Sequence, residues 1–155
     1  MSIQISLAAI DQADSIAEVL HRAFLEYEPL YTPEGFAATT PSAEKIQARW
    51  SEGPVWVAMQ EGVIVGTVAA VSKGDSLYIR SMAIVPSVRG LGTGRLMLEH
   101  VEAYARKNNF RRMFLSTTPF LERAIKLYER FGFKRIDQGP HELFGTPLFT
   151  MEMTL

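Results

Sequence analysis

Residues 85–95 read Val-Pro-Ser-Val-Arg-Gly-Leu-Gly-Thr-Gly-Arg, and they join a predicted strand to a predicted helix. The strand stops at Pro86, three glycines follow within five residues, and the helix begins among them. Glycine lets a backbone approach a ligand without interference from Cβ, and the first N–H groups of a helix have no partner inside it. A turn of this kind binds phosphate or diphosphate. Arg89 and Arg95 add positive charge to it.

The spacing of the glycines separates the classes of phosphate ligand. A nucleoside triphosphate loop, GxxxxGK[ST], needs a Lys-Ser or Lys-Thr pair, and none follows the glycines here. The dinucleotide fingerprint GxGxxG is replaced by GxGxG at Gly90, Gly92 and Gly94. Arg111 and Arg112 lie where dinucleotide folds carry an acidic residue, so an NADP-binding oxidoreductase stays open as a weaker alternative.

The segments on either side predict one mixed α/β (α+β) domain over residues 1–155, since this length suits a single domain. Apolar and β-branched runs predict strands at Ile3–Leu7, Val55–Gln60, Val63–Val71, Leu77–Val85, Met113–Thr117, Phe133–Asp137 and Leu148–Thr154, with a tight hairpin at Glu61-Gly62. Helical periodicity predicts a helix capped by Asp11, a short helix capped by Thr40, and helices at Gly92–Asn108 and Phe120–Phe131. This order predicts a mostly antiparallel central sheet with one parallel strand-helix-strand step, and helices on both faces.

Charge is unevenly distributed along the chain, although the formal net charge is only -1. Residues 1–79 carry a net charge of -6, residues 80–135 carry +8, and residues 136–155 carry -3. A local cationic block in a balanced chain suits a small phosphorylated ligand better than nucleic acid. The acidity of the first part mildly favours a cationic second substrate, whereas Arg80 favours one that bears an acid.

Several kinds of chemistry are disfavoured by composition. The chain has no cysteine, which excludes a thiolate nucleophile, and His21, His100 and His141 lack the spacing of metal ligands. No apolar run approaches the roughly 20 residues that span a bilayer, and the first residues lack a basic leader. We therefore expect no metal, no membrane and a cytoplasmic location.

Two motifs resemble those of the GNAT family of N-acetyltransferases. The first is Arg89-x-x-Gly92-x-Gly94 after a strand that ends in Ser81-Met82-Ala83-Ile84-Val85-Pro86. The second is the downstream helix Ala124-Ile125-Lys126-Leu127-Tyr128-Glu129-Arg130-Phe131-Gly132-Phe133, which fits the family pattern A-x-x-L-Y-x-x-x-G-F. Together they cover about residues 55–135 and, less specifically, the whole chain.

The resemblance implies a GNAT-like fold with acetyl-CoA as cosubstrate. It implies that the backbone of the turn, from Arg89 through Gly90, Leu91, Gly92 and Thr93 to Gly94, holds the diphosphate, and that Met82, Ala83 and Ile84 bind the pantetheine arm as an added strand. It also implies that Tyr128 faces the departing sulfur. Proton transfer from a tyrosine to a thiolate is uphill by about 2 kcal/mol at reference pKa values, so Tyr128 would chiefly donate a hydrogen bond.

The sequence departs from the family pattern at two positions. Many relatives carry Asn where this chain has Leu121, so Thr117 or Thr118 is expected to replace that contact, if it is made at all. Some relatives carry a glutamate general base where this chain has Arg80, which cannot accept a proton at ordinary pH. The general base is left unassigned among Glu26, Glu28, Glu122, His141 and an ordered water chain. Further side chains of interest are the pocket aromatics Tyr27, Tyr31, Phe36 and Trp50, and the loop 141–148, which would border the acceptor site or a homodimer contact.

These observations predict an acetyl-CoA-dependent N-acetyltransferase. The resemblance implies that the acceptor, a small-molecule or peptide primary amine, attacks the thioester directly in a ternary complex, and no cysteine is present to carry an acetyl group instead. A non-catalytic acyl-CoA sensor is the main alternative.

Overall fold

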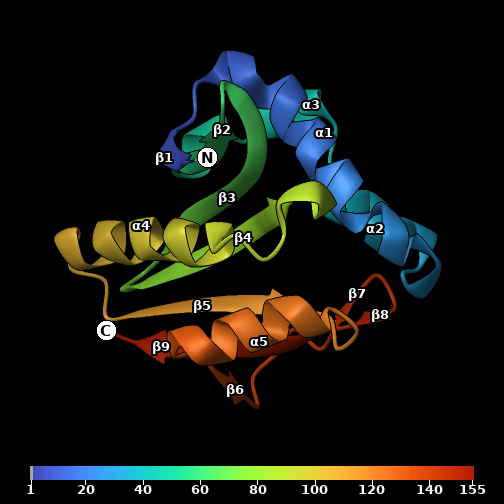
Figure 1. Cartoon of the computed structure of the whole chain (residues 1–155). Coiled ribbons are helices and arrows are strands. Elements are labelled where there is room, and N and C mark those ends of the chain that lie inside the picture. The colour runs from blue at the N-terminus through green and yellow to red at the C-terminus, as the bar shows by residue number, and fades with distance from the viewer. Residues whose placement is uncertain (1) are drawn as a thin grey trace.

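A seven-stranded sheet in the order β1-β2-β3-β4-β5-β9-β6 organises the computed structural model, which describes residues 2–155 (Figure 1). The strands of this sheet are β1 (Ile3–Leu7), β2 (Val55–Gln60), β3 (Val63–Lys73), β4 (Ser76–Ile84), β5 (Arg112–Thr117), β6 (Lys134–Ile136) and β9 (Phe149–Thr154). The helices are α1 (Ala13–Phe24), α2 (Pro33–Thr39), α3 (Ala43–Ala48), α4 (Thr93–Lys107) and α5 (Glu122–Phe131). A separate two-stranded hairpin pairs β7 (Glu142–Leu143) with β8 (Thr146–Pro147).

All neighbouring strands of the large sheet are antiparallel except β4 and β5. Helix α4 connects these two strands, so the predicted parallel strand-helix-strand step and the mixed, mostly antiparallel fold class are confirmed. Arg112 strengthens the joint, because its guanidinium donates to Ser76 Oγ on β4 at 2.8 Å and to Glu152 on β9 at 2.7 Å.

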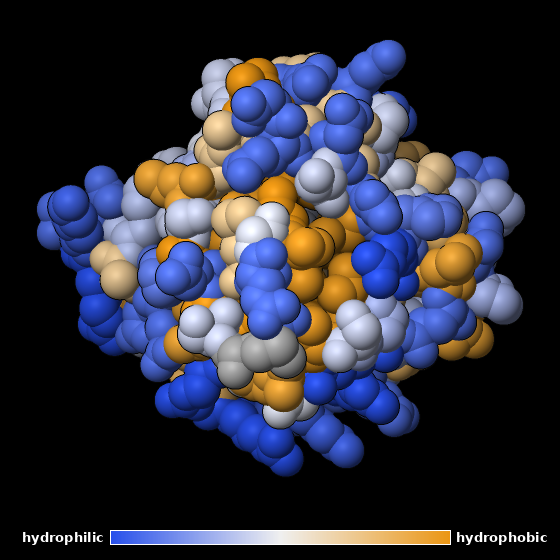
Figure 2. All heavy atoms as spheres, turned by 45° about the horizontal axis from the view of Figure 1, so that its top comes forward, coloured by the Kyte–Doolittle hydropathy of each residue, from blue (hydrophilic) through white to orange (hydrophobic). Residues whose placement is uncertain are grey.

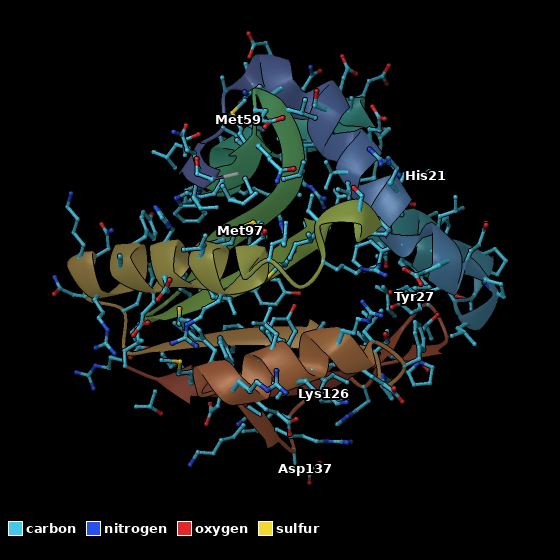
Figure 3. The ribbon with its side chains drawn as sticks, viewed as in Figure 1. His21, Tyr27, Met59, Met97, Lys126 and Asp137 are labelled. Atoms are coloured by element: carbon cyan, nitrogen blue, oxygen red, sulfur yellow. The ribbon has the colours of Figure 1, made fainter. Side chains whose placement is uncertain are left out.

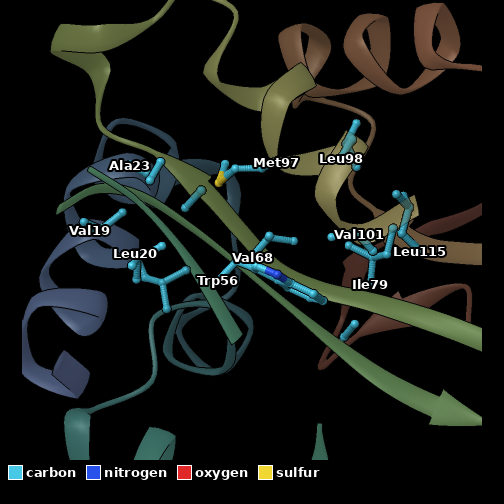
Figure 4. Close-up of a cluster of buried hydrophobic side chains, with 14 of the residues drawn as sticks. Val19, Leu20, Ala23, Trp56, Val68, Ile79, Met97, Leu98, Val101 and Leu115 are labelled. Carbon is cyan, nitrogen blue, oxygen red and sulfur yellow. The ribbon is translucent and has the colours of Figure 1, made fainter. Parts of the chain in front are cut away.

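The core is built on both faces of the sheet. Figure 4 shows strands running between side chains of α1, including Val19, Leu20 and Ala23, and side chains of α4, including Met97 and Leu98. All five are buried. This arrangement follows from the helical spacing of apolar residues in each helix and explains why the central strands are apolar on both sides.

The first third of the chain differs from the expectation in its caps. Helix α1 follows a 3-10 turn at Ile10–Gln12, and its N-cap residue is Gln12 rather than Asp11. Two prolines follow α1: Pro29 lies within the 3-10 helix Leu25–Leu30, and Pro33 begins another helix. Thr32 caps an unpredicted helix, α2, by accepting from the Gly35 amide at 3.0 Å, with Pro33 in its first turn.

The predicted cap of the next helix is also wrong. Ser42, not Thr40, caps α3 by accepting from the Lys45 amide at 3.3 Å. The Thr40 hydroxyl instead donates to the Phe36 carbonyl at the end of α2. Both residues can cap a helix, and the choice depends on where the preceding helix ends.

The later elements agree more closely with expectation. Glu61 and Gly62 both have positive φ, as the predicted tight hairpin requires. Gly132 ends α5 with φ +126°. The strand predicted at Phe133–Asp137 is shortened to β6, and β9 lies between it and β5. The hairpin β7–β8 was not predicted.

Figure 2 shows a second face of the molecule, with apolar residues gathered near the middle and hydrophilic residues around the rim. Across residues 2–155, no helix combines the length and apolar character that crossing a membrane requires. Within the same residues, no three His, Asp or Glu side chains lie together in a way that would hold a metal ion.

Candidate active site

A cleft of about 870 Å³ lies where β4 and β5 separate. Its walls come from β4, the glycine turn, the start of α4, the end of β5 and α5 on one side, and from the segment after α1 on the other. Segments far apart in the sequence therefore meet around one opening. Tyr27 of the α1 side and Lys126 of α5 mark two parts of this region (Figure 3).

The opening exists because β4 and β5 pair only over their first residues, Ser76–Tyr78 with Arg112–Phe114. The rest of β4 has no strand on that side. The Val85 amide donates to the Val65 carbonyl on β3 at 2.9 Å, so alternation along the strand turns the backbone groups of Ile84 towards the cleft. An irregularity in the β3–β4 register, with Ser81 at φ +54°, re-aims the strand just before Met82.

The glycine turn closes one end of the cleft. Gly90 and Gly92 have φ near +80°, a conformation that glycine adopts without a Cβ penalty. The first hydrogen bond of α4 runs from the Leu96 amide to the Gly92 carbonyl, so the amides of the preceding helical turn have no helical partner. The helix N-terminus therefore presents free donors and a positive dipole end to the cleft.

Two further details of this turn concern an unpaired polar atom and the packing of α4 on α5. The Thr93 hydroxyl is buried and has no hydrogen-bond partner within residues 2–155. A Cβ on Gly94 would lie 2.6 Å from Leu127 Cδ2, so glycine is what lets α4 approach α5 so closely. Of the six predicted turn residues, all but Leu91 line the cleft, and Leu91 is 55% exposed.

The arginines of the turn are not free charges. Arg89 lines the cleft and is ion-paired with Glu26 on the 3-10 helix Leu25–Leu30. Arg95 lies over the ring of Phe131, 5.7 Å from its centroid, and 3.8 Å from Glu99. Their positive charge at the turn is therefore partly offset before any ligand arrives.

Helix α5 forms the opposite wall. Only Tyr128 on this helix is fully buried, while Leu121, Ala124 and Leu127 line the cleft in partly exposed positions. The apolar stripe predicted for this helix therefore faces the opening. Burial raises the pKa of Tyr128 above its ordinary value, and the neighbouring Tyr31 raises it further. Tyr128 accordingly stays protonated and is a donor.

Leu121 also lines the cleft, together with Thr117 and Thr118. Both threonines are buried, and the Thr118 hydroxyl has no hydrogen-bond partner within the described residues. Both replacements considered for the missing asparagine therefore lie in the cleft.

Tyr27 and Tyr31 are the two predicted aromatics that line the cleft. The Tyr31 ring packs edge-on against Phe120 at 4.9 Å, and burial raises its pKa although the nearby Thr118 and Thr39 side chains lower it in part. Phe36 is buried beside Tyr31, and Trp50 packs against the core, so neither is part of the lining. The loop 141–148 borders the cleft through Leu143 and Leu148.

None of the candidate bases lies in the cleft. The lining that residues 2–155 provide contains no Asp, Glu or His, so Glu26, Glu28, Glu122 and His141 are all outside it. It contains instead seven cationic side chains: Arg49, Arg80, Arg89, Arg95, Arg123, Lys126 and Arg130. The acids of the first 79 residues do not form a cationic-acceptor site there, contrary to what their number favoured.

Sequence reasoning did not single out several lining residues, among them Arg49, Tyr78 and Ser116. Arg49 follows the last residue of α3, and Tyr78 and Ser116 lie on β4 and β5. Nothing in their local sequence marks them. The motif that did mark Arg80 would also have pointed to Tyr78, since alternate residues of a strand share a face.

The sequence matches the profile described as "Acetyltransferase (GNAT) family" over residues 17–133. The "Uncharacterized N-acetyltransferase YjgM" of Escherichia coli (strain K12) is 32% identical over 129 residues, which are 79% of this chain and 77% of that protein. The N-acetylaspartate synthetase of Danio rerio is 36% identical over 85 residues, 54% of this chain but only 30% of that longer protein.

The fold is shared with solved structures as well. The PaiA N-acetyltransferase of Thermoplasma acidophilum, crystallised with coenzyme A, superposes with a TM-score of 0.85 at 19% identity, and the match covers 100% of both chains. A profile match over most of the chain and a relative above 30% identity over three quarters of both proteins agree. The chain belongs to the acetyltransferase (GNAT) family.

Proposed function

We propose that this protein transfers the acetyl group of acetyl-CoA to a primary amine by direct attack in a ternary complex. The observation that carries the proposal is the cleft itself, in which a donor-rich glycine turn, an unpaired strand edge and a buried tyrosine meet. Membership of the family makes the chain an acetyltransferase, and the related PaiA structure was solved with coenzyme A.

The residues of the turn are suited to the diphosphate of the cosubstrate. The amides from Gly90 to Gly94 point at an anion site with the positive end of the α4 dipole behind them. Along the free edge of β4 from Met82 through Ala83 to Ile84, the amide and carbonyl groups of Met82 and Ile84 are available to the pantetheine arm, as to a neighbouring strand, while Ala83 between them pairs with Thr67 of β3.

The side chains of the cleft support direct attack. The chain has no cysteine, and the lining that residues 2–155 provide has no carboxylate that would carry an acetyl group. Catalysis then depends on placing the amine beside the thioester, an effect worth about 7 kcal/mol or more when the geometry is good. Tyr128 donates a hydrogen bond to the leaving thiolate, and its raised pKa means that it keeps its own proton.

The absence of an acid or imidazole among the described lining residues bears on how the amine loses its proton. A positively charged lining disfavours a bound ammonium ion and so lowers the pKa of the acceptor. The neutral amine is then the form that attacks, and the proton released as its N–C bond forms and the C–S bond breaks passes to water at the open side of the cleft.

A thiol-release assay with acetyl-CoA and a library of amines tests the proposal, with mass spectrometry to identify acetylated products. Initial rates should give intersecting double-reciprocal lines, as a ternary complex requires, whereas parallel lines would indicate an acetyl-enzyme. If coenzyme A binds but no amine releases thiol, the protein is an acyl-CoA sensor. A thermal shift with NADPH and none with coenzyme A would return the glycine turn to the dinucleotide alternative.

A further inference from the structure

Two arginines, Arg49 and Arg80, line the cleft at some distance along the chain from the glycine turn, and one of them pairs with a carboxylate that lies outside the lining. Arg80 on β4 is ion-paired with Glu52 on the 3-10 helix Trp50–Glu52, and its side chain is only 23% exposed. Arg49, which follows α3, is partly buried, and no carboxylate of residues 2–155 lies within 4.0 Å of its guanidinium. Both arginines line the main cleft and also a small neighbouring pocket.

This group therefore has a net positive charge in a partly buried place. Burial and the charge of Arg80 lower the pKa of Arg49, while Glu52 offsets the effect only in part. Among the described residues Glu52 pairs with Arg80 alone, so the Arg49 guanidinium keeps its donors for another anion, and a planar guanidinium binds a carboxylate well. Tyr78, whose side chain lies beside Phe114 on the same part of the cleft, adds a neutral hydroxyl donor.

We infer that the acceptor is a small amino acid-like molecule whose carboxylate is held by Arg49 and Arg80 while its amine faces the thioester. This inference rests on the proposed function. Arg80 lies two residues before Met82 on the same strand, or about 7 Å along it, so the carboxylate and the attacking nitrogen are separated by only a few bonds. The uncharged wall formed by Phe24, Tyr27 and Tyr31 is left for the rest of the acceptor.

The distribution of charge favours this reading over a structural role for the arginines. An ion pair that only supports the fold needs one arginine for Glu52, and Arg80 already supplies it. Arg49 adds a second positive charge whose burial is unfavourable unless an anion joins it. A cationic acceptor such as a polyamine would meet seven positive side chains and no negative one in the lining that residues 2–155 provide.

The experiment compares three forms of each acceptor: an amino acid, its carboxamide, and the amine that lacks the carboxyl group. We expect kcat/KM to be at least tenfold higher for the amino acid than for either analogue. Arg49→Met and Arg80→Met should raise the KM for the amino acid about tenfold or more and leave the KM for the analogues within twofold. Glu52→Gln, which releases Arg80, should lower the KM for the amino acid.

Arg106→Met is the matched control, because Arg106 pairs with Glu102 on the outer side of α4 and does not line the cleft. Unchanged affinity for coenzyme A in each variant shows that the other end of the cleft is intact. Equal use of all three acceptor forms, with no change of KM in the arginine variants, overturns the inference and leaves the acetyltransferase proposal standing. If no amine is acetylated, the proposed function fails, and calorimetric binding of amino acid against carboxamide to the coenzyme A complex still decides the carboxylate site.

Discussion

The guanidinium of Arg89, in the glycine turn, is bound to the carboxylate of Glu26, which lies 63 residues earlier on the 3-10 helix after α1. The pair connects the diphosphate end of the cleft to the segment that forms the opposite wall. The Glu26 carboxylate therefore already neutralises the arginine that we expect to lie beside the phosphate groups of the cosubstrate. If the proposed diphosphate binds at the glycine turn, it competes with Glu26 for the Arg89 guanidinium.

Substitutions of this pair should move coenzyme A affinity in opposite directions. Arg89→Met removes a cation from the turn and should weaken binding about tenfold, whereas Glu26→Gln releases that cation and should strengthen binding a few-fold at low salt. Isothermal titration calorimetry at two salt concentrations measures both. Weaker binding in both variants would show instead that the ion pair holds the turn in shape.

Gly92→Glu should abolish coenzyme A binding without unfolding the protein. Gly92 has φ +80° with no atom within 4 Å of an added Cβ, so the new side chain costs about 1–2 kcal/mol of backbone strain but no clash. Gly62→Glu is the matched control, because Gly62 has φ +79°, equally open surroundings, and a place in the β2–β3 hairpin outside the cleft. Equal thermal stability with loss of binding only in Gly92→Glu is expected. Retained binding in that variant would remove the diphosphate assignment.

Tyr128→Phe should lower turnover about tenfold or more, with coenzyme A affinity changed by less than about threefold. The phenol is a donor to the leaving group, since its raised pKa keeps it protonated. Tyr104→Phe serves as the control, because Tyr104 packs on Trp56 away from the cleft. Turnover equal to that of the parent protein would make Tyr128 a packing residue that closes α5 onto Phe133.

The free energy of unfolding should fall as the pH rises above about 10. Burial raises the pKa of Tyr31, Tyr78 and Tyr128, whereas in the unfolded chain all three ionise near pH 10. Above that pH the unfolded state binds fewer protons than the native state, so the stability present at lower pH is lost by about 1.4 kcal/mol per pH unit for Tyr128 alone.

Urea unfolding at pH 9, 10 and 11 measures this slope, and absorbance near 295 nm follows tyrosine ionisation. Tyr128→Phe should have a shallower slope than the parent protein. The same slope in both proteins would mean that Tyr128 ionises in the native state as easily as in the unfolded one.

Most elements of the fold were predictable because the spacing of apolar residues along the sequence reflects the period of each helix or strand. The alternating and continuous runs around Val55–Gln60 and the 3.6-residue period of α4 predicted their elements to within about two residues. The N-cap residues of the helices were harder to predict. Thr32-Pro33 is a helix start and also a plausible break, and only the tertiary hydrogen bond from the Thr32 amide to Thr146 Oγ1 shows how that segment is held.

The site was predictable only where a local motif marks it. The glycine turn and Tyr128 are recognisable from spacing, and the structure places both on the lining of one cleft. Arg49 was not recognisable from spacing, because it is singled out only by its position beside the Arg80–Glu52 pair, which belongs to other elements. The four side chains considered as general bases are not among the residues that line the cleft, because no local pattern shows which titratable side chains of a chain face such an opening.

Only Ser76–Tyr78 and Arg112–Phe114 join the β1–β4 half of the sheet to the β5–β9–β6 half. Few strand-to-strand hydrogen bonds join the two halves of the sheet, and the Arg112 guanidinium reinforces the paired end by bonding Ser76 on β4 and Glu152 on β9. A cosubstrate that binds between the unpaired ends of β4 and β5 adds contacts between the two halves of the sheet and stabilises them against separation. At a hundredfold excess over its dissociation constant it would add about 2.7 kcal/mol to the resistance against unfolding. Resistance to heat and to proteases should therefore rise and fall with the supply of the acyl donor.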